Sequence, residues 1–404
     1  MSNPIPSGDS AAASAAQAPL KILLVTEQFY DANNGMTISS RRFAAVLRAH
    51  GHEIRILSYG KPENLDPEHP AYLLSKQYIP VFDNLVASQG MVFAKVDTAI
   101  LDEAIRWADV VHFLTPFALS HAGILLARKY GVPYTAAFHV QPENVTSSIH
   151  LGKVDWVNDC VYNWFRHYVF RYCSHIHCPS EFIAGELRRH GYTAQLHVIS
   201  NGIDPDFHYQ KLPKDPELDG KFVILMVGRL SIEKRQDVLV DAVAKSKYRD
   251  RIRLVLAGKG PRKEQISRRG AKRGIDLTIQ FFPKPELLRL IAMSDLYVHA
   301  ADMEIEAMSC MEAFAGGLVP IIANSAKSAT PQFALDDRSL FAAGDSADLA
   351  RKIDYWIEHP QEKAEMEHRY AASAEAYNLD RCVRQAEDMF RMAIAEQQEI
   401  AYGA

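Results

Sequence analysis

Residues 21–57 read KILLVTEQFYDANNGMTISSRRFAAVLRAHGHEIRIL, and they begin and end in short apolar runs. The runs Lys21–Thr26 and Glu53–Leu57 have the length of buried strands. Between them, apolar residues recur at helical spacing until Gly51, and glycine commonly ends a helix. A strand, a helix and a second strand in this order form a βαβ unit, which predicts a parallel sheet.

The same alternation of strands and helices continues along the chain in two series. Further strands of the first series are expected at 110–113, 134–138 and 175–178. Strands of the second series are expected at 221–227, 253–257, 277–282, 296–299 and 319–323. The segment 202–220 between the series is rich in Pro, Asp and Lys, which is typical of a linker. The sequence therefore predicts an α/β fold with two Rossmann-like, doubly wound domains, 19–201 and 221–375, facing a cleft.

The two ends of the chain differ from these domains. Residues 1–18 are rich in Ala, Ser, Pro and Gly and lack the apolar run of a signal peptide, so we expect a disordered tail. The segment 376–404 is expected to contain one long helix, at 381–400. No apolar run approaches the roughly 18 residues that a membrane helix needs. We therefore expect a cytoplasmic protein that at most lies on a membrane surface.

The composition excludes several classes of protein. The net charge of −4 gives no global attraction to nucleic acid, so no nucleic-acid partner is expected. The five cysteines include no C-x-x-C pair, so neither a disulfide framework nor a zinc site is expected, and a reducing compartment fits. With 48% apolar residues, the 404-residue chain can form sizeable cores in two domains of roughly 150 residues each.

Two cations follow the first strand of the second series. In Val227-Gly-Arg-Leu-Ser-Ile-Glu-Lys234, the residues Gly228, Arg229 and Lys234 lie between that strand and the next helix. Cations beside the amino end of a helix form an anion site that suits a diphosphate. The alternative is an ordinary loop with two surface cations.

Two carboxylates, Glu304 and Glu312, follow the strand expected at 296–299. Glu312 falls within a helix whose other residues are mainly apolar, where an unpartnered carboxylate is costly. Hydroxyl groups of a sugar or a ribose would satisfy it, because a carboxylate can accept two hydrogen bonds in a fork. The alternative is one acid at the start of a helix and a second on its surface.

Together, these residues resemble the motifs of the family 4 retaining glycosyltransferases, which have the GT-B fold. Arg229 and Lys234 match the Arg-x4-Lys pair that grips the donor diphosphate in that family. Glu304 and Glu312 match its Glu-x7-Glu motif, and the resemblance implies that Glu304 faces the sugar and Glu312 the ribose. The turn that ends at Gly35 is similar to the family's glycine-rich loop near the phosphates.

The resemblance extends to the segments that join the domains. The stretch 198–204 is similar to the family's interdomain segment, and 376–404 to the helix that crosses back to the first domain. Many relatives have Gly-Phe-Gly after the first Glu, where this chain has Ile305, Glu306 and Ala307. We expect these three residues at the donor, and the missing glycines leave the identity of the donor sugar open.

His139 follows the strand expected at 134–138, at a carboxyl end in the first domain. The resemblance implies a histidine there, close to the 6-hydroxyl of the donor sugar, although a lone histidine can also be an ordinary satisfied polar residue. His139-Val-Gln-Pro-Glu143 is similar to the His-x-Gln-x-Glu stretch of the diacylglycerol glucosyltransferases. This similarity implies that Gln141 and Glu143 lie on the acceptor side.

The segment 154–172 has apolar and aromatic residues at helical spacing, with basic residues between them. A helix packed on the first sheet would show this pattern. So would an interfacial helix with an aromatic face and basic flanks, which would bring the protein into peripheral contact with an anionic membrane. We place Trp164 of this segment on the acceptor side.

The expected reaction is a retaining hexosyl transfer that needs no metal or other cofactor. The cations of the Arg-x4-Lys pair would stabilise the departing diphosphate electrostatically, and Asp204-Pro-Asp206, which has the form of a metal clamp, lies in the linker. The expected donor is UDP-glucose or UDP-galactose, and the expected acceptor is a lipid such as diacylglycerol or a cell-envelope saccharide. The alternatives are a GDP-mannose-dependent mannosyltransferase, a nucleotide-sugar epimerase, a non-catalytic sugar-nucleotide-binding subunit and a structural protein.

Overall fold

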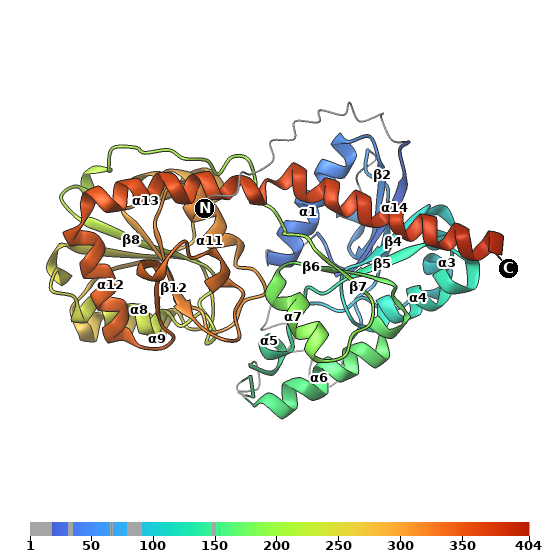
Figure 1. The fold of residues 1–404 in the computed structure, drawn as a ribbon, viewed down its shortest axis with the longest axis horizontal. Coiled ribbons are helices and arrows are strands. Elements are labelled where there is room, and N and C mark those ends of the chain that lie inside the picture. The colour runs from blue at the N-terminus through green and yellow to red at the C-terminus, as the bar shows by residue number, and fades with distance from the viewer. Residues whose placement is uncertain are drawn as a thin grey trace, which may run out of the picture.

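The computed structural model describes residues 18–30, 35–64, 66, 68–78, 91–147, 151, 152 and 154–403. The tail expected at 1–18 lies outside these residues, except for Ala18, and so does the turn at 31–34 before Gly35. The described chain forms two domains, each built on one sheet, which lie side by side in Figure 1. No helix in these ranges has the length and apolar character that a membrane span requires.

The first domain is built on a seven-stranded sheet with the order β3-β2-β1-β4-β5-β6-β7, in which every neighbouring pair is parallel. The strands are β1 Lys21–Gln28, β2 Glu53–Tyr59, β3 Ala71–Leu74, β4 Val110–Phe113, β5 Tyr134–Ala137, β6 His175–Cys178 and β7 Gln195–Val198. Strand β1 lies inside the sheet with both faces covered, which explains its nearly continuous apolar sequence.

Helices cover both faces of this sheet. They are α1 Gly35–Ala49, α3 Thr98–Trp107, α4 Ala118–Tyr130, α5 Pro142–Ser147, α6 Asp155–Tyr168 and α7 Glu181–Arg189. The ends of these helices follow from local chemistry, because Ser180 caps the amino end of α7 and Gly131 ends α4 in the left-handed conformation, with a φ of 67°. Helices α3, α4, α6 and α7 contribute to one core, and α1 to a second.

The second domain is built on a six-stranded parallel sheet with the order β10-β9-β8-β11-β12-β13. Its strands are β8 Phe222–Val227, β9 Ile252–Ala257, β10 Asp276–Gln280, β11 Leu296–His299, β12 Pro320–Asn324 and β13 Leu340–Ala342. Its helices are α8 Gln236–Lys245, α9 Lys263–Arg273, α10 Lys284–Met293, α11 Met308–Ala315, α12 Ser346–Glu358 and α13 Pro360–Ser373. These elements share one large core.

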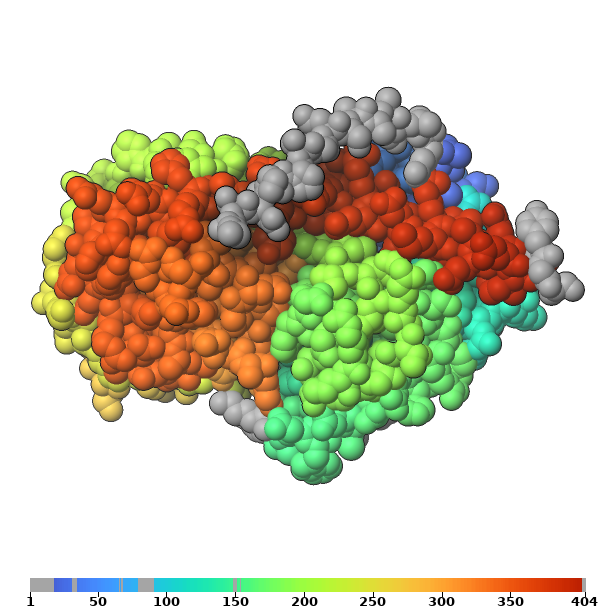
Figure 2. All heavy atoms as spheres, in the orientation of Figure 1, coloured from blue at the N-terminus to red at the C-terminus, as the bar shows by residue number. Residues whose placement is uncertain are grey.

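The last helix, α14, spans Leu379–Gly403 and packs on the first domain, although it follows the second domain in the chain. It shares a core with α1 and the first sheet through Leu379, Cys382, Val383, Ala386, Met389 and Phe390. The helix is the long red one in Figure 1, and Figure 2 shows it on the surface above the boundary between the orange and green domains. The chain therefore passes between the domains twice, once in the linker and once before α14.

Candidate functional site

The strand order of the second sheet reverses between its central strands β8 and β11. The chain continues from β8 to β9 on one side and from β11 to β12 on the other, so the loops after β8 and β11 diverge. Open parallel sheets bind ligands at such a point, beyond the carboxyl ends of the strands. The loop 228–235 contains Arg229 and Lys234, and the loop 300–307 contains Glu304. The structure thus places both charged motifs at the switch point.

The loop after β8 requires glycine at its first position. Gly228 has a φ of 153°, and a Cβ on Gly258 would lie only 1.9 Å from the Gly228 carbonyl oxygen. The glycines of Gly258-Lys-Gly260 therefore allow two loops to pack closely. The Arg229 carbonyl accepts a hydrogen bond of 2.8 Å from the Gln236 side chain, which fixes the backbone at the half-buried Arg229.

The two loops at the switch point are tied to each other. The Asp302 amide donates to the Glu233 carbonyl at 2.8 Å, and Arg235 Nη1 lies 2.8 Å from Asp302 Oδ2. Lys234 lies between these two contacts in sequence, and its side chain pairs with Glu304 in the loop 300–307. Because the ties involve both backbone and side chains, the relative position of the loops is well determined.

Glu304 is ionised and buried beside a lysine and a histidine. Lys234 Nζ forms an ion pair with Glu304 Oε1, and the same oxygen lies 3.0 Å from His299 Nε2. Burial alone would raise the pKa of Glu304, but Lys234 and His299 together lower it to about 2. His299 Nδ1 lies 3.3 Å from the Tyr297 hydroxyl, which fixes the histidine ring from its other side.

Glu312, the second carboxylate of the motif, lies on α11 and contacts the first domain. Its Oε1 accepts a hydrogen bond of 2.8 Å from Arg42 Nη1, and Arg42 belongs to α1. Burial raises the pKa of Glu312, although Arg42 lowers it. Arg42 Nε also lies 3.4 Å from Asp204 Oδ2, and Lys284 binds both Asp204 and Asp206. The carboxylates of the Asp-Pro-Asp sequence thus have cationic side chains as partners.

The residues Ile305 and Glu306, which follow Glu304, both bind residues of the first domain. The Ile305 carbonyl accepts a hydrogen bond of 2.6 Å from the Ser180 hydroxyl, and the Ile305 side chain packs against the core of the first domain. Glu306 Oε2 accepts hydrogen bonds from the backbone and side-chain amides of Asn201, at 2.9 and 2.6 Å. Burial raises the pKa of Glu306 to about 7, although these hydrogen bonds lower it.

The amino ends of α1 and α11 lie close together. A Cβ on Gly35, the first residue of α1, would lie 3.4 Å from the side chain of Met308, the first residue of α11. Ala307 precedes α11 with a φ of 69°, a left-handed conformation that residues other than glycine rarely adopt. Because the amino end of a helix attracts negative charge, this meeting of two helices favours an anion.

His139 follows β5 and belongs to a group of three histidines. Its ring centroid lies 5.0 Å from that of His177, which lies 6.0 Å from that of His112. Burial and the other two histidines hold the pKa of His139 well below its usual range, so the half-buried ring is neutral. Among the described residues, none forms a hydrogen bond with this ring, whereas His177 contacts the Ile199 carbonyl at 2.7 Å.

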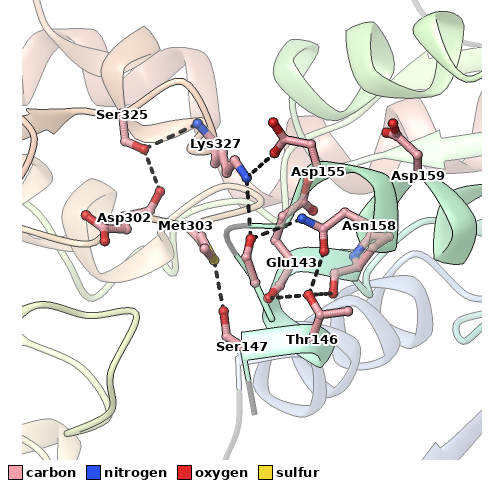
Figure 3. A network of polar contacts seen from close by, with 12 residues as sticks. Glu143, Thr146, Ser147, Asp155, Asn158, Asp159, Asp302, Met303, Ser325 and Lys327 are labelled. Carbon is pink, nitrogen blue, oxygen red and sulfur yellow. Dashed lines mark hydrogen bonds and ion pairs between the residues drawn. The ribbon is translucent and has the colours of Figure 1, made fainter. Parts of the chain in front are cut away.

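A second set of contacts between the domains involves Gln141 and helices α5 and α6. Gln141 Nε2 donates to the Lys327 carbonyl at 3.0 Å, and Lys327 Nζ lies 2.6 Å from Asp155 Oδ1. The Ser147 hydroxyl lies 3.2 Å from the Met303 sulfur. Figure 3 shows Lys327 extending from the second domain towards the first, with Met303 beside Ser147. The second domain therefore touches the segment that follows His139.

Helix α6 has one buried face and one exposed face. Tyr162 and Phe165 are buried in the core of the first domain, whereas Trp156 and Trp164 are 71% and 49% exposed. The buried face confirms the interpretation of a helix packed on the first sheet, and the interfacial interpretation stays a prediction. Glu143 is buried beside α6, where it accepts a hydrogen bond of 3.3 Å from the Tyr162 hydroxyl, and burial raises its pKa.

Sequence analysis missed His299, Arg42 and Asn201. His299 ends the strand before Glu304, so the position of a titratable side chain at a carboxyl end was the signal that could have identified it. Arg42 and Asn201 lie 270 and 105 residues from the carboxylates that they bind. The resemblance of 198–204 to the family's interdomain segment was a signal for Asn201, whereas no local pattern marks Arg42.

Two family models match the chain, and they adjoin one another. The model described as Glycosyltransferase Family 4 matches residues 33–207, and the model described as Glycosyl transferases group 1 matches residues 209–376. The boundary between the matches falls in the linker between the two sheets.

Curated relatives match about three quarters of the chain. A GDP-mannose-dependent α-mannosyltransferase of Corynebacterium glutamicum is 28% identical over 75% of this chain and 72% of the relative. An α-monoglucosyldiacylglycerol synthase of Streptococcus pneumoniae is 25% identical over 76% of this chain and 71% of the relative.

A solved structure agrees with the fold over nearly the whole chain. Anabaena HepE in complex with UDP and glucose superposes with a TM-score of 0.70, covering 92% of this chain and all of that chain at 17% identity. Since this fold and the two family matches agree, the chain belongs to family 4 of the glycosyltransferases, has the GT-B fold and takes a sugar nucleotide as its donor.

Proposed function

We propose that this glycosyltransferase moves a hexosyl group from UDP-glucose or UDP-galactose to the hydroxyl group of a lipid, with retention of configuration and without a metal ion. Arg229 and Lys234 bind the diphosphate, Glu304 binds the sugar and Glu312 binds the ribose. His139 lies at the 6-hydroxyl of the sugar. Gly228, Gly35 and the residues 305–307 form the backbone around the donor.

The observation that supports this proposal best is the contact of Glu304 with both Lys234 and His299 at the switch point of the second sheet. Lys234 brings a positive charge to the place where a diphosphate would gain negative charge as it leaves. Glu304 is ionised there and can accept hydrogen bonds from two sugar hydroxyls. Lys234 and Glu304 therefore combine the two interactions that the transfer of a sugar needs: a cation for the leaving diphosphate and an acceptor for the sugar hydroxyls.

In the proposed step, the acceptor oxygen approaches C1 of the sugar from the same face as the leaving diphosphate. The bond from C1 to the phosphate oxygen breaks, the bond from C1 to the acceptor oxygen forms, and the departing phosphate oxygen takes the proton of the acceptor. Lys234 and Arg229 stabilise the phosphate charge, and no side chain has to form a covalent intermediate.

A lipid acceptor is supported by the exposed aromatic residues of α6 and by the likeness to a diacylglycerol glucosyltransferase. Trp156 and Trp164 are large apolar side chains in contact with solvent, as found on surfaces that meet lipid. We place the acceptor beside His139 and Gln141, near the helix pair α5 and α6. Peripheral contact with an anionic membrane belongs to the same proposal.

One matrix of donors and acceptors tests the proposal. UDP-glucose, UDP-galactose, UDP-N-acetylglucosamine and GDP-mannose are each incubated with diacylglycerol vesicles, sterol vesicles or a soluble oligosaccharide, and nucleotide release is followed. We expect release to depend on a UDP-hexose and a lipid, and to continue in EDTA. An α-linked product by proton NMR indicates retention, and a β-linked product would refute it. Unchanged background release with every pair would refute catalysis by this chain alone.

A GDP-mannose-dependent mannosyltransferase is the second candidate. The similarity to the mannosyltransferase of Corynebacterium glutamicum favours it, because that identity is as high as for the glucolipid synthase. In the same matrix it would appear as release that requires GDP-mannose and not a UDP-sugar.

A further inference from the structure

The nucleoside end of the proposed donor site contains a charge partner from the opposite domain. Glu312 on α11 is 9% exposed, and Arg42 on α1 donates to its Oε1 at 2.8 Å. Among the described residues, no hydrogen bond reaches Glu312 Oε2, so this oxygen can accept one from a ligand. One oxygen of the carboxylate is thus fixed by the first domain, and the other is available.

The side chain of Arg42 is itself held in place. Its Nε lies 3.4 Å from Asp204 Oδ2, and its guanidinium lies 6.0 Å from the ring centroid of Phe207. Lys284 Nζ lies 2.6 Å from the same oxygen of Asp204. Because the guanidinium is planar and contacts two carboxylates, it cannot turn away from Glu312 without losing the contact with Asp204 as well.

We propose that Arg42 is a positioning residue for the nucleoside of the donor, so that nucleotide binding depends on both domains. This inference rests on the proposed function, in which Glu312 binds the ribose. Arg42 favours the ionised form of Glu312 and fixes the direction of its free oxygen. Removal of Arg42 should therefore weaken nucleotide binding. If Arg42 competed with the ribose for Glu312, its removal would tighten binding.

The surroundings of Glu312 make the effect depend on pH. Arg42 from α1 and Lys284 from α10 favour the ionised form, whereas burial and Asp204 from the linker oppose it. Without Arg42, Glu312 takes up a proton at a higher pH than in the parent chain. Nucleotide binding by the variant should then decrease, relative to the parent, as the pH falls from 8 to 6.

Calorimetric titration of the full chain with UDP and with GDP at pH 6 and pH 8 tests this inference. We expect Arg42→Met to raise the dissociation constant at least about tenfold, because a hydrogen bond to a charged group is lost. The increase should be larger at pH 6, and Arg42→Lys, which keeps the charge, should recover part of the affinity. Arg48→Met is the matched control on the same helix, because Arg48 contacts the Ile54 carbonyl and not Glu312. Its affinity should equal that of the parent.

The outcomes separate this inference from the proposed function. The role of Arg42 is overturned if the dissociation constant of Arg42→Met is unchanged or lower. It is also overturned if the increase is equal at both pH values. If that variant does not fold, Arg42→Gln has the same expectation. Glu312→Gln should weaken binding equally at both pH values. If Glu312→Gln binds nucleotide as tightly as the parent, the assignment of Glu312 to the ribose is wrong. If Glu312→Gln binds more weakly but Arg42→Met does not, the proposed function stands and the inference about Arg42 fails.

Discussion

Replacing Glu306 with Gln should remove one component of the pH dependence of stability. Glu306 is 1% exposed, and burial raises its pKa from 4.5 to about 7, despite the hydrogen bonds from Asn201. Because the pKa is higher in the folded chain, this contribution to stability is complete below pH 4.5 and is lost as the pH rises through 7. The difference corresponds to about 3 kcal/mol in the free energy of unfolding.

Urea-induced unfolding at pH 5 and at pH 8 measures this loss. Gln keeps a carbonyl oxygen for the two Asn201 donors but does not ionise, so the parent should lose about 2 to 3 kcal/mol more than Glu306→Gln between these pH values. Glu27→Gln provides a second test in the first domain, because burial also raises the pKa of Glu27 to about 7. Glu264→Gln is the control, since the side chain of Glu264 is 87% exposed.

Equal losses in the parent and in Glu306→Gln would show that Glu306 does not change its ionisation between pH 5 and pH 8. The argument from burial would then be wrong for this residue. A reduced loss in Glu264→Gln would show that the measurement does not distinguish buried from exposed carboxyl groups.

Three further predictions concern the site and the contact between the domains. Lys234→Ala and Arg229→Ala should each lower nucleotide release at saturating donor roughly a hundredfold, and near-parental rates in both would contradict their assignment to the diphosphate. Ala307→Gly should raise the thermal midpoint in scanning calorimetry, because the left-handed conformation costs alanine roughly 1 kcal/mol; a lower midpoint would show that Ala307 is not strained. Lys327→Glu and Asp155→Lys should each raise KM for the acceptor severalfold, and the double variant should recover the parental KM. The effect is only severalfold because this partly exposed ion pair contributes less than about 1 kcal/mol to the contact between the domains. A double variant no better than either single one would exclude a direct effect of the pair.

The sequence predicts the interior of both sheets well because interior strands are buried on both faces. The strands β4, β6 and β11 begin and end at the expected residues, and β1 and β8 begin within one residue of expectation. The sequence does not mark β3, β7 and β13, which lie at the edges of the sheets. These three strands are short and partly exposed, as the half-exposed β7 illustrates, so they lack the apolar run that identifies an interior strand. The fourth edge strand, β10, is expected at 277–282 and spans Asp276–Gln280.

The motif residues of the site can be predicted because their chemistry restricts the residue types. A pair of cations after β8 and a carboxylate after β11 lie at strand ends, where the fold brings loops together. Other contacts around the site depend on how the two domains meet. Ser180 of the first domain contacts the Ile305 carbonyl, and Gln141 contacts the Lys327 carbonyl. Contacts to backbone carbonyls need no particular residue type at the partner position, so the sequence gives no sign of them.

One face of α1 joins the two domains at the proposed donor site. Gly35 lies against Met308, and the Ser39 hydroxyl donates to Asn201 Oδ1 at 2.6 Å, while Asn201 binds Glu306. Arg42 binds Glu312. The three residues of α1 are four and three positions apart, which places them on the same side of the helix.

This face of α1 also explains how the chain can lack the Gly-Phe-Gly sequence that follows the first Glu in many relatives. Ala307 adopts the left-handed conformation that a glycine would adopt there. Glu306 replaces the aromatic residue with a carboxylate, which is tied through Asn201 to Ser39 on α1. The segment that follows Glu304 is thus held by hydrogen bonds from Asn201 and Ser180 of the first domain. A displacement of α1 would therefore disturb the sugar end and the nucleoside end of the proposed donor site together.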